Sequence, residues 1–218
     1  MSNGIGYGIL IAGSVTNGVD ILTNTITNFS SNFVDTKSQN TTINHNTLTN
    51  SPSSFASKHG INIQSGASGT SLYNNTLFRI IASGTSPGAI AVFQSSINMS
   101  YINMTDSYSG LEIRGSIGDI NLINSTISNS SYKDIINNID DANGGRLRLY
   151  NVSFNKSKVS YTVAGDYQGF IEVYYQYNTK VTNQNLNNVQ SANVTLKDVY
   201  GTQLDSQLTD VNGLTNPV

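Results

Sequence analysis

Six polar side chains recur at a fixed spacing in this chain and are candidates for one binding site. They form two series, offset by two residues: Asp119, Arg146, Glu172 and Asn121, Arg148, Tyr174. Successive members of each series lie about 26 residues apart, and units of this length that stack in register would turn each series into a column on one face. Arginine pairs with carboxylates and tyrosine stacks on flat ligand faces, so the six residues indicate a sugar or carboxylate site.

A purely structural interpretation fits the same residues. Alternating acidic and basic side chains on neighbouring strands make an ion-pair ladder, in which each pair contributes some tenths of a kcal/mol. Glu112 and Arg114, in the segment LEIRG, would extend the same face. We expect no catalytic residues, because spacing alone indicates no nucleophile and base in contact.

Metal chemistry has weaker candidates. Asp140 and Asp141 are adjacent in DIINNIDDANGG, and adjacent side chains on a strand point to opposite faces, so we expect a solvated loop with calcium as the alternative. Asp210 and Asn212 could begin a calcium loop, but the later ligands are missing and a turn is expected. The two histidines, at 45 and 59, are not neighbours in the repeat. We therefore expect no metal site and no cofactor.

The elements that would position these residues follow a repeat. Short apolar runs end in asparagine at an average interval of about 26 residues: Asn24, Asn46, Asn75, Asn103, Asn124, Asn151 and Asn178. A second column starts with a glycine and continues with alternating apolar residues, as in GINI from Gly60 and GLEI from Gly110. Period-two alternation and β-branched residues indicate short strands, and no segment has helical periodicity over three turns.

Stacked units of such strands make a parallel β-helix. We predict an all-β, right-handed, single-stranded parallel β-helix of 7–8 coils over residues 1–200, since connections between parallel strands are right-handed in nearly all cases. Inward side chains would stack on their equivalents about 4.8 Å away. Asparagine suits the corners because it tolerates the left-handed backbone region, and stacked amides can hydrogen-bond from coil to coil.

The C-terminal segment breaks this pattern. Residues 201–218 contain turn signals such as DVNG, and with the preceding DVYG they resemble the first strands of immunoglobulin-like modules that follow β-helices in surface proteins. We predict a C-terminal cap or linker toward a following module.

Composition excludes several classes of partner. Charged residues make up 11% of the chain and the net charge is −2, which gives no electrostatic basis for binding nucleic acid. Asn, Ser and Thr together are far more frequent than charged residues, so the expected surface is polar and neutral. We expect no membrane insertion, since no apolar run is long enough to cross a bilayer, and no disulfide, since cysteine is absent. A monomer is expected.

The repeat segments ILTNTITNFSSN, INHNTLTNSPSS and INLINSTISNSS resemble the repeats of periplasmic copper proteins and pectate-lyase-like β-helices. They most resemble the repeats of adhesin-like surface proteins of archaeal methanogens. That resemblance implies an extracellular, cell-surface fragment of a larger exported protein, which binds carbohydrate or a partner cell surface without catalysis. The alternatives are a carbohydrate-active β-helix enzyme (a polysaccharide lyase or glycoside hydrolase) and a structural spacer or viral fibre segment, which would trimerise.

Overall fold

The structure is a computed structural model that describes residues 8–11, 18–28, 31–51, 59–81, 88–93, 95–115, 118–139, 145–161, 170–175 and 178–216. The chain divides into two compact units, Met1–Tyr174 and Tyr175–Val218. The first unit contains all the parallel strands and both candidate sites described below.

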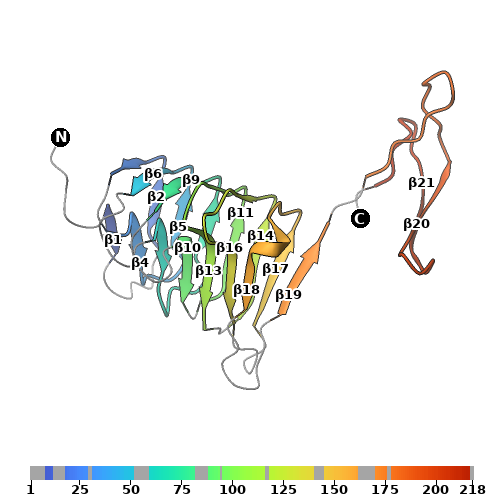
Figure 1. Cartoon of the computed structure of the whole chain (residues 1–218). Helices are drawn as coiled ribbons and strands as arrows, with labels where there is room; N and C mark the ends of the chain where they lie inside the picture. Colours follow the sequence, from blue (N-terminus) through green and yellow to red (C-terminus); the bar gives the residue numbers. More distant parts are fainter. Residues whose placement is uncertain are drawn as a thin grey trace. The chain divides into compact units, whose positions relative to one another are not determined.

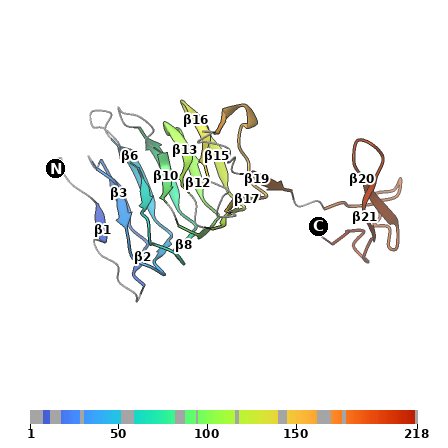
Figure 2. The ribbon, with the colours of Figure 1, turned by 90° about the horizontal axis from the view of Figure 1, so that it is seen from below.

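Three parallel sheets form the first unit (Figures 1 and 2). Sheet A contains β1 (Ile9–Ile11), β4 (Val34–Thr36), β7 (Ile61–Ile63), β10 (Gly88–Phe93), β13 (Ser109–Arg114), β16 (Lys133–Asn138) and β18 (Val159–Tyr161). Sheet B contains β2 (Asp20–Leu22), β5 (Thr42–Asn44), β8 (Ser71–Tyr73), β11 (Ile97–Ser100), β14 (Ile120–Ile123), β17 (Arg146–Tyr150) and β19 (Phe170–Tyr174). Sheet C contains β3 (Thr25–Thr27), β6 (Thr47–Ser51), β9 (Thr76–Ile80), β12 (Asn103–Thr105) and β15 (Thr126–Ser128).

The chain visits sheets A, B and C in turn and then returns to sheet A one strand further along, which makes a parallel β-solenoid. This confirms the predicted all-β parallel architecture; the right-handed winding stays a prediction. Among the described residues the helical element is a short 3₁₀ helix, η2 (Lys156–Lys158). None of the described segments is a helix with the length and apolar character that crossing a membrane requires.

The number of coils differs from the prediction of 7–8. In the described chain, five coils contribute a strand to all three sheets, and two further coils contribute strands to sheets A and B. After β17 the path along sheet C is reduced to a single bridge between Thr126 and Ser153, and η2 follows. The predicted number was too high because it included the two coils that lack a sheet C strand and extended the repeat to residue 200, whereas the last solenoid strand, β19, ends at Tyr174.

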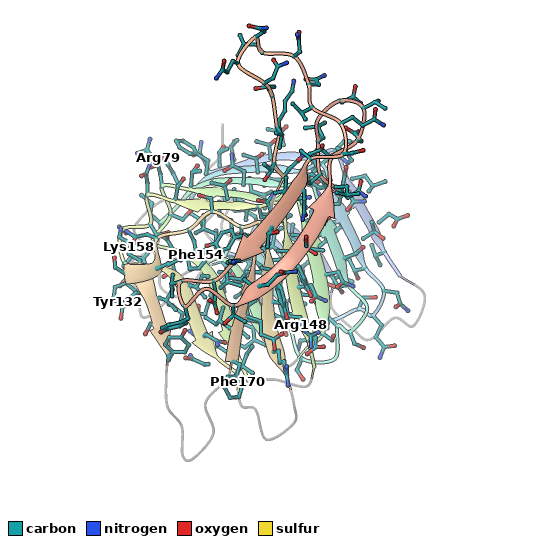
Figure 3. The ribbon with its side chains drawn as sticks, turned by 90° about the vertical axis from the view of Figure 1, so that its right-hand side faces the viewer. Arg79, Tyr132, Arg148, Phe154, Lys158 and Phe170 are labelled. Carbon is teal, nitrogen blue, oxygen red and sulfur yellow. The ribbon has the colours of Figure 1, made fainter. Side chains whose placement is uncertain are left out.

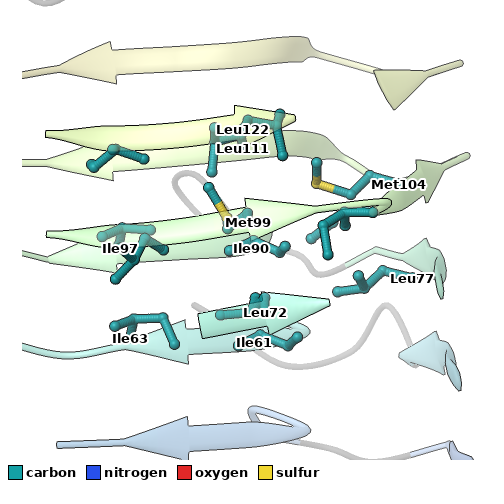
Figure 4. Close-up of a cluster of buried hydrophobic side chains, with 14 of the residues drawn as sticks. Ile61, Ile63, Leu72, Leu77, Ile90, Ile97, Met99, Met104, Leu111 and Leu122 are labelled. Atoms are coloured by element: carbon teal, nitrogen blue, oxygen red, sulfur yellow. The ribbon is translucent and has the colours of Figure 1, made fainter. Parts of the chain in front are cut away.

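The core consists of columns of equivalent side chains (Figure 4). One sheet B column is Ile21, Ile43, Leu72, Met99, Leu122 and Leu149. These six residues are buried because alternate residues of each short strand point inward, whereas Val173, the next member of the column on β19, is 37% exposed. Fully burying such a side chain stabilises the fold by about 1.5–3 kcal/mol, so each coil gains most of its stability from contact with its neighbours.

The glycine column belongs to the start of sheet A, where coils approach closely. A β-carbon at Gly60 would lie 2.6 Å from the carbonyl oxygen of Ala89 and 2.6 Å from Leu77. A β-carbon at Gly110 would lie 2.3 Å from Ile127. Only glycine fits these two positions, which explains why the motif recurs.

The asparagine column proved to be two adjacent columns at the corner between sheets B and C. Six residues have positive φ there: Thr23, His45, Asn74, Tyr101, Asn124 and Asn151. The next position holds Asn24, Asn46 and Asn75 and then apolar or small residues. Because both positions favour asparagine, the asparagine repeat in the sequence looks the same when the alignment of the coils is shifted by one residue.

Each of the two columns has its own amide contacts. Asn151 donates to the Oδ1 of Asn124 at 2.8 Å, so those two residues do align. Asn103 begins β12 instead, and Asn178 lies in the second unit. The expected alignment of Asn178 with Asn124 and Asn151 was therefore wrong.

The second unit contains one antiparallel pair, β20 (Asn193–Lys197) and β21 (Gln203–Leu208). These strands join none of the three parallel sheets, so the structure places the boundary between Tyr174 and Tyr175 rather than at residue 200. Asp198 closes the turn between them by accepting hydrogen bonds from the backbone N–H groups of Tyr200 and Thr202. The role of this unit as a cap or linker stays a prediction.

The buried amide ladder should be a large local contribution to stability. The side chain of Asn46 accepts from the backbone and side-chain N–H groups of Asn24 and donates to Asn75 Oδ1 at 3.0 Å. Replacing Asn46 by Ala leaves several buried polar groups unpaired, so we expect the free energy of unfolding to fall by about 2–3 kcal/mol. Urea denaturation followed by circular dichroism measures this change.

The matched control is Asn121→Ala, which removes an exposed amide contact with Asn98 of the neighbouring coil. Its effect should stay within about 0.5 kcal/mol. Equal losses of unfolding free energy from both substitutions would contradict the prediction that the buried amide contacts contribute more than an exposed one.

Candidate functional site

The six residues predicted as a site lie along three consecutive strands of sheet B. Asp119 precedes β14, and the others sit on β14, β17 and β19: Asn121, Arg146, Arg148, Glu172 and Tyr174. We call these six residues the sheet B patch. Arg146 and Arg148 alternate along β17 with the buried Leu147 and Leu149, so the two arginine side chains lie on the outer face. Figure 3 shows Arg148 on the opposite side of the solenoid from Tyr132 and Lys158.

The register within the patch differs from the prediction at its last step. Arg148 aligns with Asn121, as expected, but its partner on β19 is Glu172 rather than Tyr174. Arg146 aligns with Phe170. The coil that joins β17 to β19 is therefore two residues shorter than assumed. A shift of two residues keeps every side chain on its face, so period-two alternation cannot detect it.

Ion pairs connect the charged members of the patch. Arg148 donates through Nη1 to Asp119 and through Nε to Glu172 Oε2, the latter at 2.9 Å. Arg146 donates to the other oxygen of Glu172, and the Tyr174 hydroxyl donates to Oε2 at 3.1 Å. The hydrogen bond from Arg148, followed by those from Arg146 and Tyr174, lowers the pKa of Glu172. Glu172 is thus held ionised, and two guanidinium groups balance two carboxylates.

Aromatic rings border the patch. Tyr174 stacks on Tyr150 with ring centroids 4.6 Å apart and an interplanar angle of 10°, and 44% of Tyr174 is exposed. Further along the same edge of sheet B, Tyr73 contacts His45 and Tyr101 at centroid distances of 5.4 and 5.3 Å. The carboxyl ends of the sheet B strands therefore present aromatic rings in two groups, one near β8 and β11 and the other on β17 and β19.

Glu112 and Arg114 do not extend the sheet B patch, because β13 belongs to sheet A. They join a second group on the outer face of sheet A, which sequence reasoning missed. We call it the sheet A cluster: Asn32, Asp35, His59, Asn62, Gln64, Glu112 and Arg114. One outer column of this sheet runs Asp35, Asn62, Ala91, Glu112, and all four residues are buried.

Each carboxylate of the sheet A cluster has its own donors. Asp35 accepts hydrogen bonds from the amide groups of Asn32 at 2.9 Å, Asn62 at 3.2 Å and Gln64. Glu112 Oε1 accepts from Arg114 Nε at 2.7 Å. Burial raises the pKa of Glu112, and the hydrogen bond and charge of Arg114 oppose that rise.

His59 is neutral in this cluster. Its Nδ1 accepts the backbone N–H of Gly88 at 3.1 Å, so that nitrogen carries no proton. Glu112 Oε2 lies 3.9 Å from the same nitrogen, which is too long for a hydrogen bond, and the two groups do not form an ion pair. Burial, and then the charge of Arg114, lower the pKa of His59 to about 4.

A signal for the sheet A cluster existed in the sequence. In the segments GINI and GLEI a polar residue stands between two apolar residues, and in FVDT it stands between a valine and a threonine. Aligning them on the glycine column places Asp35, Asn62 and Glu112 together. The sequence did not show that the outer face of this sheet is buried, and His59 was considered only as a possible metal ligand beside His45.

Of the two weaker metal candidates, one pair of residues lies outside the described residues and the other forms a turn. Asp140 and Asp141 are outside the described residues. Asp210 Oδ1 accepts the backbone N–H groups of Leu214 at 2.9 Å and Asn212 at 2.8 Å, which is the geometry of a turn. Among the residues that the structure describes, no three acidic, histidine or cysteine side chains gather as metal ligands.

Comparison with known protein families, characterised proteins and solved structures found no match for this chain. The assignment of the fold as a parallel β-solenoid therefore rests on the structure alone. The resemblance to pectate-lyase-like repeats and to adhesin-like surface proteins remains a prediction from the repeat segments.

The buried neutral histidine predicts a pH-dependent stability. A pKa near 4 in the folded protein lies below the unfolded value of about 6.5, so the unfolded chain takes up the proton first as pH falls. His59 should therefore reduce the free energy of unfolding by about 3 kcal/mol between pH 6.5 and 4. Glu112 acts in the opposite sense, because its raised pKa favours protonation of the folded state.

His59→Asn keeps an acceptor for the Gly88 N–H group but cannot titrate. As pH falls through this window, the free energy of unfolding of the wild type should therefore fall relative to that of His59→Asn. Urea denaturation at several pH values measures it. His45→Asn is the control, because His45 is exposed at a positive-φ corner that asparagine tolerates. A His59→Asn profile parallel to that of the wild type would contradict the prediction.

Proposed function

We propose that this chain is a non-enzymatic, cell-surface adhesion module that contacts carbohydrate on a partner cell through the sheet B patch. It would be an extracellular part of a larger exported protein, acting as a monomer and without a cofactor. The observation that carries the proposal is the exposed Tyr174 ring, stacked on Tyr150 and flanked by the polar groups of Glu172 and Arg146.

An aromatic ring beside paired charges is a suitable surface for a pyranose. The apolar face of the sugar would lie on the Tyr174 ring, its hydroxyls would donate to Glu172, and they would accept from Arg146, which is half exposed. The ion pairs hold these side chains in place before binding, so little conformational entropy is lost. Both guanidinium groups already face carboxylates, which favours an uncharged sugar over an acidic one.

The geometry argues against a glycoside hydrolase. Such an enzyme needs one carboxylic acid with a raised pKa and a second carboxylate about 5–9.5 Å away. In the patch the pKa of Glu172 is lowered. In sheet A, Asp35 and Glu112 are three strands apart, which is about 14 Å. Neither arrangement supplies the required pair.

Glycan-array binding tests the patch. Combining Arg146→Ala, Arg148→Ala and Tyr174→Leu removes the hydrogen-bond donors and the stacking ring, so we expect binding to the best glycans to fall at least about ten-fold, equivalent to about 1.4 kcal/mol. Arg79→Asn is the control, because Arg79 is exposed on sheet C at a positive-φ position that asparagine tolerates, and it should bind like the wild type. Unchanged binding by the triple variant would overturn the patch as the site.

The non-enzymatic part of the proposal has its own assay. Reducing-sugar and unsaturated-uronide measurements over common polysaccharides, with and without calcium, should show no turnover. Product formation that depends on the wild-type chain would establish the alternative, a β-helix lyase or hydrolase.

A further inference from the structure

The outer face of sheet A carries a hollow of about 540 Å³. Its lining comes from three consecutive coils at the ends of β7, β10 and β13: Asn62, Gln64, Ser65, Phe93, Arg114 and Gly115. The volume lies within the range of small-molecule sites, about 300–1,000 Å³. The hollow is on a different sheet from the patch and shares no residue with it.

One residue that lines this hollow, Asn62, carries a buried and unsatisfied acceptor. Asn62 is 8% exposed, and its amide nitrogen donates to Asp35. A carboxylate only accepts, which fixes the orientation of the amide and leaves Asn62 Oδ1 on the other side. Within the described chain no group donates to this oxygen. An unpaired buried acceptor costs about 1–3 kcal/mol, so a ligand hydroxyl that donates to it would be favourable.

Phe93 and Arg114 form the apolar and donor wall of the hollow. The guanidinium carbon of Arg114 lies 5.3 Å from the centroid of the Phe93 ring, and Nε is fixed by Glu112. The Arg114 side chain is 40% exposed, so the end of the guanidinium group beyond Nε can donate to ligand oxygens. An aromatic ring, a pair of donors and a buried acceptor together match the two faces of a sugar.

Charge decides which sugar fits. Arg114 is already paired with Glu112, Asp35 is held by the amides of Asn32 and Asn62, and His59 is neutral. Among the described residues the hollow therefore offers no unpaired cation to a uronate or a phosphate. We propose that this hollow binds a single uncharged hexopyranose unit, with a hydroxyl on Asn62 Oδ1, the ring oxygen and a neighbouring hydroxyl oxygen facing Arg114, and the C–H face toward Phe93. The site is independent of the sheet B patch.

Saturation-transfer NMR on the full chain tests the site with methyl glucoside, methyl galactoside and methyl mannoside as probes. At least one should bind the wild type, and Phe93→Leu should raise its Kd about five-fold or more by removing the flat ring. Phe78→Leu is the matched control, because Phe78 is also half-buried and lies 6.0 Å from its own arginine, Arg79. Ser65→Tyr, at an exposed rim position, should block the hollow without touching the core.

The outcomes separate this site from the patch. Binding that survives the triple patch variant but is lost in Phe93→Leu and Ser65→Tyr supports the hollow, whatever the glycan array shows. The proposal is overturned if none of the three glycosides binds, if glucuronate or glucosamine binds more tightly than all three, or if Phe93→Leu and Ser65→Tyr both bind like the wild type. Phe93→Leu is interpreted only if its circular dichroism matches that of Phe78→Leu; otherwise Ser65→Tyr alone decides.

Discussion

Registry between neighbouring coils is the constraint on which the whole solenoid depends. Every strand of the three sheets pairs with the strand one coil away, so each side chain faces its own equivalents above and below. A position must therefore suit stacking on itself, which favours aliphatic residues inside and residues that tolerate positive φ at the corners. Asn46 satisfies the same rule with hydrogen bonds, because it accepts from one neighbour and donates to the other. Residue choice thus follows from column position more than from local propensity.

The same constraint explains how the two outer groups arise. On sheet B, registry brings Asn121, Arg148 and Glu172 side by side, and charges of opposite sign then pair along the column. On sheet A the equivalent column is buried, so Asp35 and Glu112 need amide and guanidinium donors close at hand. One architecture therefore produces an exposed charged surface on one side and an enclosed polar group on another.

Much of the fold was predictable from sequence, because column identity leaves a periodic trace. The strand class, the inward positions and the pairing of Asn121 with Arg148 followed from alternation and repeat length. The placement of Glu172 did not, because coils vary in length and a two-residue shift leaves the faces unchanged. The corner column was blurred for a related reason, since two neighbouring positions both accept asparagine. The hollow beside Phe93 depends on which outer face is buried, and residue types alone carry no such information.

The orientation of the backbone hydrogen bonds has a mechanical consequence. In a solenoid these bonds run between coils, along the direction in which the strands stack, and not across it. Tension applied along that direction would load the bonds of one interface at a time, so the unit should peel apart coil by coil at low force. Sheets pulled parallel to their strands must instead break many bonds together in shear. A solenoid of this construction would therefore yield gradually under stretching along its axis.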